Sequence, residues 1–357
     1  MLLSRYLGLN MPVPSIGGIT QLGTKYSLPP SWGSGPPGLK VEQILWALYE
    51  IGYAPVSHEA KDPNEANELI YTYVESGIPP ILIIGYPTNN FHAVTVVGHT
   101  YDPCVKALDK TKSDVNSSSI WSPLFLFHDD QIGPYLKLRI GSPRPHMHRP
   151  SILIDKCDPL LQSNMEEVIK WYSDASLYFI IAAFPPRYEL TPDKAAAKGR
   201  VILEIAYRAH KSFLEKQGVK KPAVPIYRTF FIPSNQFRSH FNPQKIVGLS
   251  PELAHWYRGS IYPRFIWVTE LCDFEHRDLK QPNDLRVIAD TIIDPTSPPH
   301  SLDFVTLHVP HLFFRMPPST TDTAKALSSP IAFIRDDRPY QPILRLQSAQ
   351  APLVPCI

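Results

Sequence analysis

Apolar residues recur at helical spacing in several segments near the start of the chain. Residues 1–8 have such a pattern and lead into a loop rich in Gly, Pro and Ser. A clearer helix is predicted over 39–52, with an apolar face formed by Val41, Ile44, Leu45, Leu48 and Ile51. Another helix begins after Asp62, whose side chain can cap the first turn, and continues from Pro63 to a stop at Gly77.

The pattern then changes to short apolar runs that are joined by turn residues. Four consecutive strands are predicted in this region, over 78–87, 91–102, 122–133 and 135–141. Helices followed by an antiparallel meander indicate an α+β fold. A basic, proline-rich stretch from 142 to 150 follows the last strand and predicts a seam between two domains.

Beyond this seam, helical and strand-like segments begin again. A short helix is predicted at 165–174, and a long one at 192–217 with Thr191 as its N-cap. Strands are predicted over 177–184, 224–233, 264–271, 286–294, 304–310 and 330–336. The chain is therefore expected to contain a first domain at 1–145, a second domain with an α/β pattern at 150–345, and a tail at 346–357.

Charge and cysteine usage exclude several classes of protein. The 35 basic and 33 acidic residues leave a formal net charge of +2, which gives no electrostatic basis for binding nucleic acid or an anionic membrane. No apolar run approaches about 18 residues, so no membrane span is expected. Four widely separated cysteines without a CxxC spacing argue against a disulfide framework and a cysteine zinc site, and favour a reducing, cytoplasmic location.

One pair of positions in the predicted meander has catalytic potential. His92 opens one strand, whereas Asp129 and Asp130 end another. Neighbouring antiparallel strands can bring an imidazole and a carboxylate together, so that the carboxylate orients the ring and stabilises its protonated form. The alternative interpretation is that His92 is a partly buried structural residue.

The order of motifs supports the catalytic interpretation. The segments MLLSRYLGL, GLKVEQILWALYEIGY, PPILIIG, HAVTVVGH and FLFHDDQIGPY follow one another over roughly residues 1–141. This series resembles the papain-like cysteine peptidases of the bacteriocin-processing, double-glycine-leader type. The resemblance implies a papain-like fold, with His92 as general base and acid and Asp129 as its orienter, although Asp130 stands where that family usually has proline. It implies a peptide or protein substrate. No cofactor or metal is expected.

The same resemblance raises the question of the nucleophile. In that family a cysteine lies at the N-terminus of the first helix, where the helix dipole favours the thiolate. Aligning the end of that helix with Leu7 and Gly8 puts the cysteine before Met1, and the first 103 residues contain none. The expected protein is thus a cysteine peptidase-like hydrolase without its nucleophile, as a shortened enzyme or a pseudoenzyme. A noncatalytic peptide-binding or regulatory protein is the alternative, and the oligomeric state is left open.

Other polar residues allow further sites. Imidazoles that could hold a metal are found at His92, His99, His128, His146 and His148. However, a spacing of seven puts the first two on opposite faces of a regular strand. A pocket for an anionic ligand or peptide could be lined by Arg228, Asn235, Gln236, Arg238, Arg258 and Arg264, although a solvated rim over an aromatic core is the alternative. Cys104 is expected to be an inert thiol.

The missing cysteine leads to the first prediction. Peptide hydrolysis that depends on a thiol is expected to be absent from this chain as its sequence stands, because the base has no thiol to activate. The measurement is a peptide-cleavage assay with and without a thiol alkylator. Cleavage that the alkylator abolishes would contradict this expectation.

Overall fold

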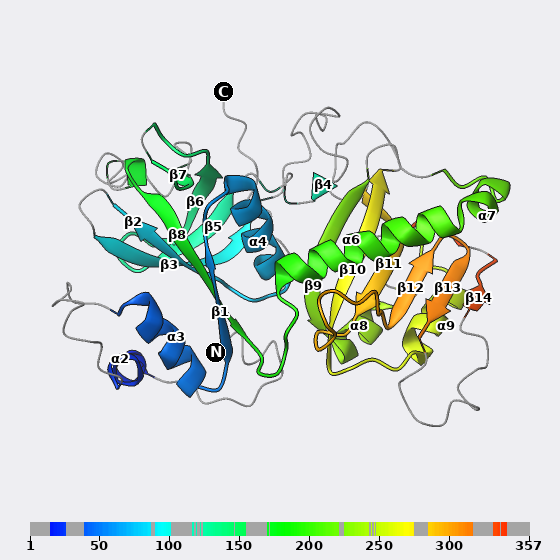
Figure 1. Cartoon of the computed structure of the whole chain (residues 1–357), viewed down its shortest axis with the longest axis horizontal. Coiled ribbons are helices and arrows are strands. Elements are labelled where there is room, and N and C mark those ends of the chain that lie inside the picture. Colours follow the sequence, from blue (N-terminus) through cyan, green and yellow to red (C-terminus); the bar gives the residue numbers. More distant parts are fainter. Residues whose placement is uncertain are drawn as a thin grey trace. The chain divides into compact units, whose positions relative to one another are not determined.

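A computed structural model divides the chain into two compact units. Of the residues that it describes, those up to Thr100 and Ser122–Tyr188 form the first unit, and 116–119 and 189–340 form the second. The described residues are 15–25, 39–86, 90–100, 116–117, 119, 122, 124–145, 147–154, 170, 172–220, 225–242, 244, 246, 248–274, 285–316, 331–335 and 337–340. Both units combine helices with a mainly antiparallel sheet, which agrees with the predicted α+β class (Figure 1).

The first unit is built on a sheet of seven antiparallel strands. In spatial order they are β1 (Ala54–Glu59), β8 (Ser176–Phe184), β2 (Ile81–Gly85), β3 (Phe91–His99), β5 (Phe125–Asp129), β6 (Gly133–Gly141) and β7 (Ser151–Ile154). The four predicted strands of the meander are confirmed as β2, β3, β5 and β6. Strand β7 also pairs with β8, through Ser151 and Ser176, so that the strands from β8 to β7 form a closed ring.

This closure places the end of the first unit later than the sequence pattern suggests. The seam was expected at 142–150, but β7 pairs with β6 and β8 inserts between β1 and β2. Both strands therefore belong to the first sheet, and the unit continues to Tyr188. The proline-rich stretch is a connection between two strands of one sheet.

A bulge in β3 changes which side chains share a face of the sheet. Val96 pairs with Phe127, whereas His99 pairs with Phe125, and the register shifts between them. Since Phe125 and Phe127 lie on one face, His99 lies on the same face as Val96. His92 also lies on this face, because it is four residues before Val96 in the regular part of the strand. The expectation that His92 and His99 point to opposite faces is therefore wrong, because it assumed a regular strand.

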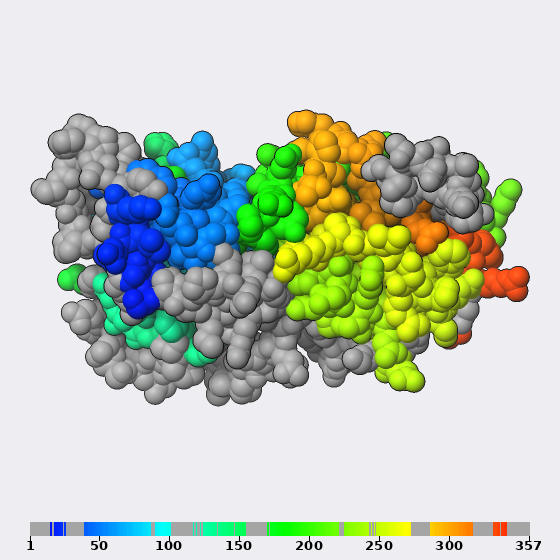
Figure 2. Space-filling view, turned by 90° about the horizontal axis from the view of Figure 1, so that it is seen from below, coloured from blue at the N-terminus to red at the C-terminus, as the bar shows by residue number. Residues whose placement is uncertain are grey.

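Three helices of the first unit are described: α2 (Ile16–Thr24), α3 (Val41–Glu50) and α4 (Pro63–Glu75). Helix α4 confirms its predicted cap, because the Asp62 carboxylate accepts hydrogen bonds from the backbone N–H groups of Asn64 and Glu65. Helix α2 lies in a segment that was expected to be a loop; Ser15 caps it, and it packs against α3 (Figure 2). The helix predicted at 1–8 lies outside the described residues.

The second unit contains another seven-stranded sheet. Its order is β14 (Ile331–Phe333), β13 (Leu312–Arg315), β12 (Thr306–Val309), β11 (Leu285–Ile293), β10 (Phe265–Phe274), β9 (Ile226–Pro233) and β4 (Asn116–Ser117). All neighbours are antiparallel except β4 and β9. The α/β pattern read from the sequence therefore corresponds to a mainly antiparallel sheet with helices, and five of its strands are those predicted.

Helices pack around this second sheet. The long helix predicted at 192–217 is present as α6 (Pro192–Ala209) and α7 (Lys211–Lys216), with a break at His210. Helices α8 (Ser234–His240) and α9 (Pro251–Gly259) supply Phe237, Leu253 and Tyr257 to a buried apolar cluster. The helix predicted at 165–174 and the tail at 346–357 fall largely or wholly outside the described residues. No described helix combines the length and apolar character needed to cross a membrane.

One close approach between α6 and the second sheet gives a stability prediction. A Cβ added at Gly199 would lie 2.1 Å from Oγ1 and 2.5 Å from Cβ of Thr269, a buried residue of β10. Gly199→Ala is therefore expected to lower the free energy of unfolding by about 1–3 kcal/mol through overpacking. Urea denaturation followed by tryptophan fluorescence measures this change.

Gly259→Ala is the matched control, because a Cβ at this exposed helix end has nothing within 4 Å. Its free energy of unfolding is expected to stay within about 0.5 kcal/mol of the parent. Equal effects of the two substitutions would show that the close approach of Gly199 to Thr269 does not limit the stability of the protein.

Candidate functional site

The structure brings His92 and Asp129 together. His92 lies at the start of β3 and Asp129 at the end of β5, and the two strands are antiparallel neighbours. Nε2 of His92 lies 3.1 Å from Oδ1 of Asp129, at ion-pair distance but without the alignment of a hydrogen bond. The side chains are 13% and 1% exposed, so the contact is largely shielded from water.

The carboxylate of Asp129 is held on both oxygens. Oδ1 accepts the backbone N–H of Gln131 at 2.8 Å and that of Ile132 at 3.3 Å, and Oδ2 accepts the hydroxyl of Tyr172. The two backbone bonds are local, because a strand-ending Asp can accept from residues of the turn that follows it. Gly133 completes this turn with a φ of +132°, a conformation that favours glycine.

Asp130 has a different environment. Its Oδ1 lies 3.7 Å from Nε2 of His92, and its side chain is 80% exposed. Of the two carboxylates that the sequence offered as orienters, Asp129 is therefore the closer and the buried one.

Burial and charge set the protonation of the pair. The Asp129 carboxylate raises the pKa of His92, and burial of the ring only partly opposes this effect. Burial by itself would raise the pKa of Asp129, but its contacts with His92, Tyr172 and the Gln131 N–H outweigh this and lower it to about 2. Burial, with repulsion from Asp129, raises the pKa of Tyr86 to about 12. The carboxylate is thus ionised and favours an imidazolium beside it.

The orientation of the ring determines which nitrogen is available for chemistry. Nε2 faces the carboxylates, and among the described residues no group makes a hydrogen bond to Nδ1. A carboxylate on one side of an imidazole fixes its orientation and raises the basicity of the other nitrogen. The arrangement can therefore accept a proton at Nδ1 from a neighbouring acidic group and return it later.

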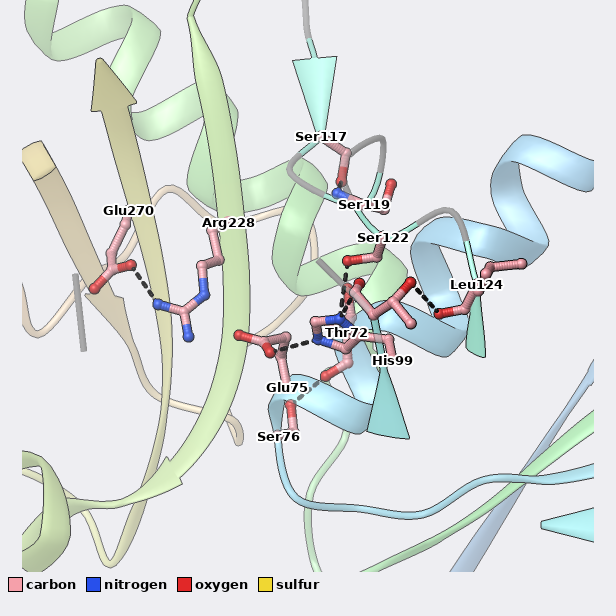
Figure 3. A network of polar contacts seen from close by, with 11 residues as sticks. Thr72, Glu75, Ser76, His99, Ser117, Ser119, Ser122, Leu124, Arg228 and Glu270 are labelled. Atoms are coloured by element: carbon pink, nitrogen blue, oxygen red, sulfur yellow. Dashed lines mark hydrogen bonds and ion pairs between the residues drawn. The ribbon is translucent and has the colours of Figure 1, made fainter. Parts of the chain in front are cut away.

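His99 belongs to a separate polar cluster at the other end of β3 (Figure 3). Its Nε2 lies 2.8 Å from Oε1 of Glu75, the last residue of α4, and its Nδ1 lies 3.0 Å from both the Ser122 hydroxyl and the Thr100 carbonyl oxygen. This cluster links α4, β3 and the segment that leads into β5. The sequence did not indicate it, because Glu75 and Ser122 are far from His99 along the chain and no motif connects them.

The imidazoles considered for a metal are thus not gathered into one site. His99 contacts Glu75, and His128 is exposed on β5. Among the described residues, one group of three ligand types lies close enough to hold an ion: His92, Asp129 and Asp130. The side chain of His146 lies outside the described part of the chain.

The arginines of the second unit do not all lie on a solvated rim. Arg228 is buried and contacts the buried carboxylate of Glu270 at 3.1 Å, a pair also drawn in Figure 3. Glu270 is paired in register with Asp290, and Asp290 with His308, so four charged or titratable side chains cross the sheet in one row. Arg238 donates to the carbonyl oxygen of Ser260.

The row ends in a buried ion-pair cluster. His308 lies 2.8 Å from the Asp337 carboxylate and 3.5 Å from that of Asp290, which also accepts the hydroxyls of Tyr257 and Tyr340. Burial by itself would lower the pKa of His308, but attraction by the two carboxylates raises it to about 10. Arg228 and His308 thus pair with carboxylates inside the second unit.

The cysteines of the described region offer no nucleophile beside His92. Cys272 is fully buried in β10 of the second unit. Cys104, Cys157 and Cys356 lie outside the described residues. Comparisons with known protein families, with curated proteins and with solved structures found no match to this chain.

The charge relationship within the pair is testable. Asp129→Asn removes the negative charge that stabilises the imidazolium, so the pKa of His92 is expected to fall. The measurement is an NMR titration of the histidine ring protons, with the signal of His92 assigned from a His92→Gln variant.

Asp130→Asn is the control, because this exposed carboxylate is farther from the ring. Its effect on the pKa of His92 is expected to be smaller and of the same sign. An unchanged pKa in the Asp129→Asn protein would show that the two side chains are not coupled in solution.

Proposed function

We propose that the first unit carries the acid–base pair of a papain-like cysteine peptidase site, which acts on a peptide or related acyl bond. The observation that supports this most is the orientation of His92, whose Nε2 faces a buried carboxylate while Nδ1 has no partner among the described residues. The motif order along residues 1–141 supports it independently.

In the proposed reaction, Nδ1 of His92 accepts the proton of a thiol, and the thiolate attacks the acyl carbon. The imidazolium then donates this proton to the leaving group, and water, deprotonated by the same ring, hydrolyses the thioester. Asp129 fixes the orientation of the ring and stabilises its charged form. Its lowered pKa keeps the carboxylate ionised near neutral pH.

The base and its orienter belong to this chain, whereas the position of the thiol follows from the resemblance. In the family that the chain resembles, the thiol lies at the N-terminus of the first helix, and the first cysteine of this sequence is Cys104. The alternative function, a noncatalytic peptide-binding or regulatory protein, is favoured by the lack of a cysteine beside His92 among the described residues. In that case His92, oriented by the buried Asp129, contributes a polar contact to the bound peptide.

The test adds a cysteine-bearing helix N-terminal to Met1 and assays peptide hydrolysis. Alkylator-sensitive cleavage is expected, and His92→Gln is expected to lower kcat/KM by about 10²–10⁴-fold, because it removes the general base. Asp129→Asn should reduce it less, since the base remains.

His128→Gln is the matched control, because this histidine is exposed on the neighbouring strand and is given no part in the reaction. Its kcat/KM should equal that of the parent. Cleavage that survives His92→Gln contradicts the proposal. An extended protein that binds peptide without hydrolysing it supports the binding alternative.

A further inference from the structure

Three potential metal ligands converge at the end of β5. Nε2 of His92 and one carboxylate oxygen each from Asp129 and Asp130 all lie within 4.8 Å of one another. The nitrogen is 3.1 Å from the first oxygen and 3.7 Å from the second. His92 lies at the start of β3 and Asp129 at the end of the neighbouring strand β5, so the sheet fixes the positions of two of the three ligands.

These separations lie close to those of zinc ligands. Zinc binds imidazole nitrogen and carboxylate oxygen at about 2.0–2.2 Å, which in a tetrahedron puts the ligand atoms about 3.3–3.5 Å apart. The two observed distances fall on either side of this range. Asp130 is 80% exposed, so its side chain can make the small adjustment required.

The environment of each ligand also fits a metal site. Nε2 of His92 is buried and makes no aligned hydrogen bond, although two carboxylate oxygens lie within 4 Å of it. Asp129 is oriented by Tyr172 and by the backbone N–H of Gln131, as ligating carboxylates commonly are. Two carboxylates and one neutral imidazole also neutralise the charge of a divalent ion.

We propose that His92, Asp129 and Asp130 bind a divalent transition-metal ion of the zinc class, with water at the remaining position. Binding replaces the proton on Nε2, so one proton is released for each imidazolium that takes up an ion. A metal-bound imidazole keeps its other proton on Nδ1 and cannot act there as a base. Zinc therefore inhibits the hydrolysis proposed above; this consequence rests on that proposed function, whereas binding itself does not.

The experiment uses the full chain, stripped of metal, and measures Zn²⁺ binding by competition with a chromophoric chelator. One ion per chain is expected. Asp130→Asn should weaken the affinity by at least about tenfold and His92→Gln by more, because each removes a ligand. Asp174→Asn, which alters an exposed carboxylate elsewhere in the same unit, should leave the affinity unchanged.

Two further readouts make the test independent of activity. Co²⁺ instead of Zn²⁺ should give a visible absorption band in the parent that is lost in His92→Gln, and zinc affinity should rise with pH as the imidazole loses its proton. Asp130→Asn leaves the His92–Asp129 pair intact, so a loss of zinc binding in this variant is distinguishable from a failure of the catalytic proposal. Absence of stoichiometric binding, or equal affinity in the parent and both ligand variants, overturns the inference.

Discussion

The buried carboxylate of Asp129 is the constraint on which the site depends. A charge removed from water is tolerated only when it is paired and hydrogen-bonded. Here the compensation comes from three parts of the chain: the turn after β5, the hydroxyl of Tyr172 and the imidazole of His92. The contacts that stabilise the Asp129 carboxylate therefore hold three parts in place: the turn after β5, the segment before β8 and the His92 ring at the start of β3. The low pKa of Asp129 and the raised pKa of His92 are consequences of the same arrangement.

Closure of the first sheet provides the framework for this burial. Because β8 pairs with β1, β2 and β7, residues near 150 and 180 complete a sheet whose other strands lie before residue 142. Tyr172 reaches Asp129 because its segment leads directly into β8. The bulge in β3 has a separate effect, since it turns His99 to the face where it contacts Glu75. One strand thus carries two histidines with different surroundings, one beside the buried carboxylate of Asp129 and one in a cluster with Glu75 and Ser122.

The second unit uses buried charge differently. Arg228, Glu270, Asp290 and His308 occupy one row across four strands, and each has an oppositely charged neighbour. Such pairs contribute little net stability compared with apolar residues, yet losing one partner is costly. They favour a single strand register, because a shift by one residue would turn each charge to the other face of the sheet. This row therefore favours one register of the sheet, whereas the imidazole of the pair in the first unit has an Nδ1 without a hydrogen-bond partner among the described residues.

Local features of the chain were determined by the sequence alone. The cap and length of α4, the strands β2, β3, β5 and β6, and the candidate pair of His92 with a strand-ending carboxylate all follow from residues close together in the chain. Helix α2 was missed because its glycines and short length leave a weak pattern. Only the tertiary structure decided that Asp129 is buried while Asp130 is exposed, that Tyr172 supports it, and that β7 and β8 close the first sheet. These features depend on contacts between distant segments, whose register is set by the packing of the whole unit rather than by local spacing.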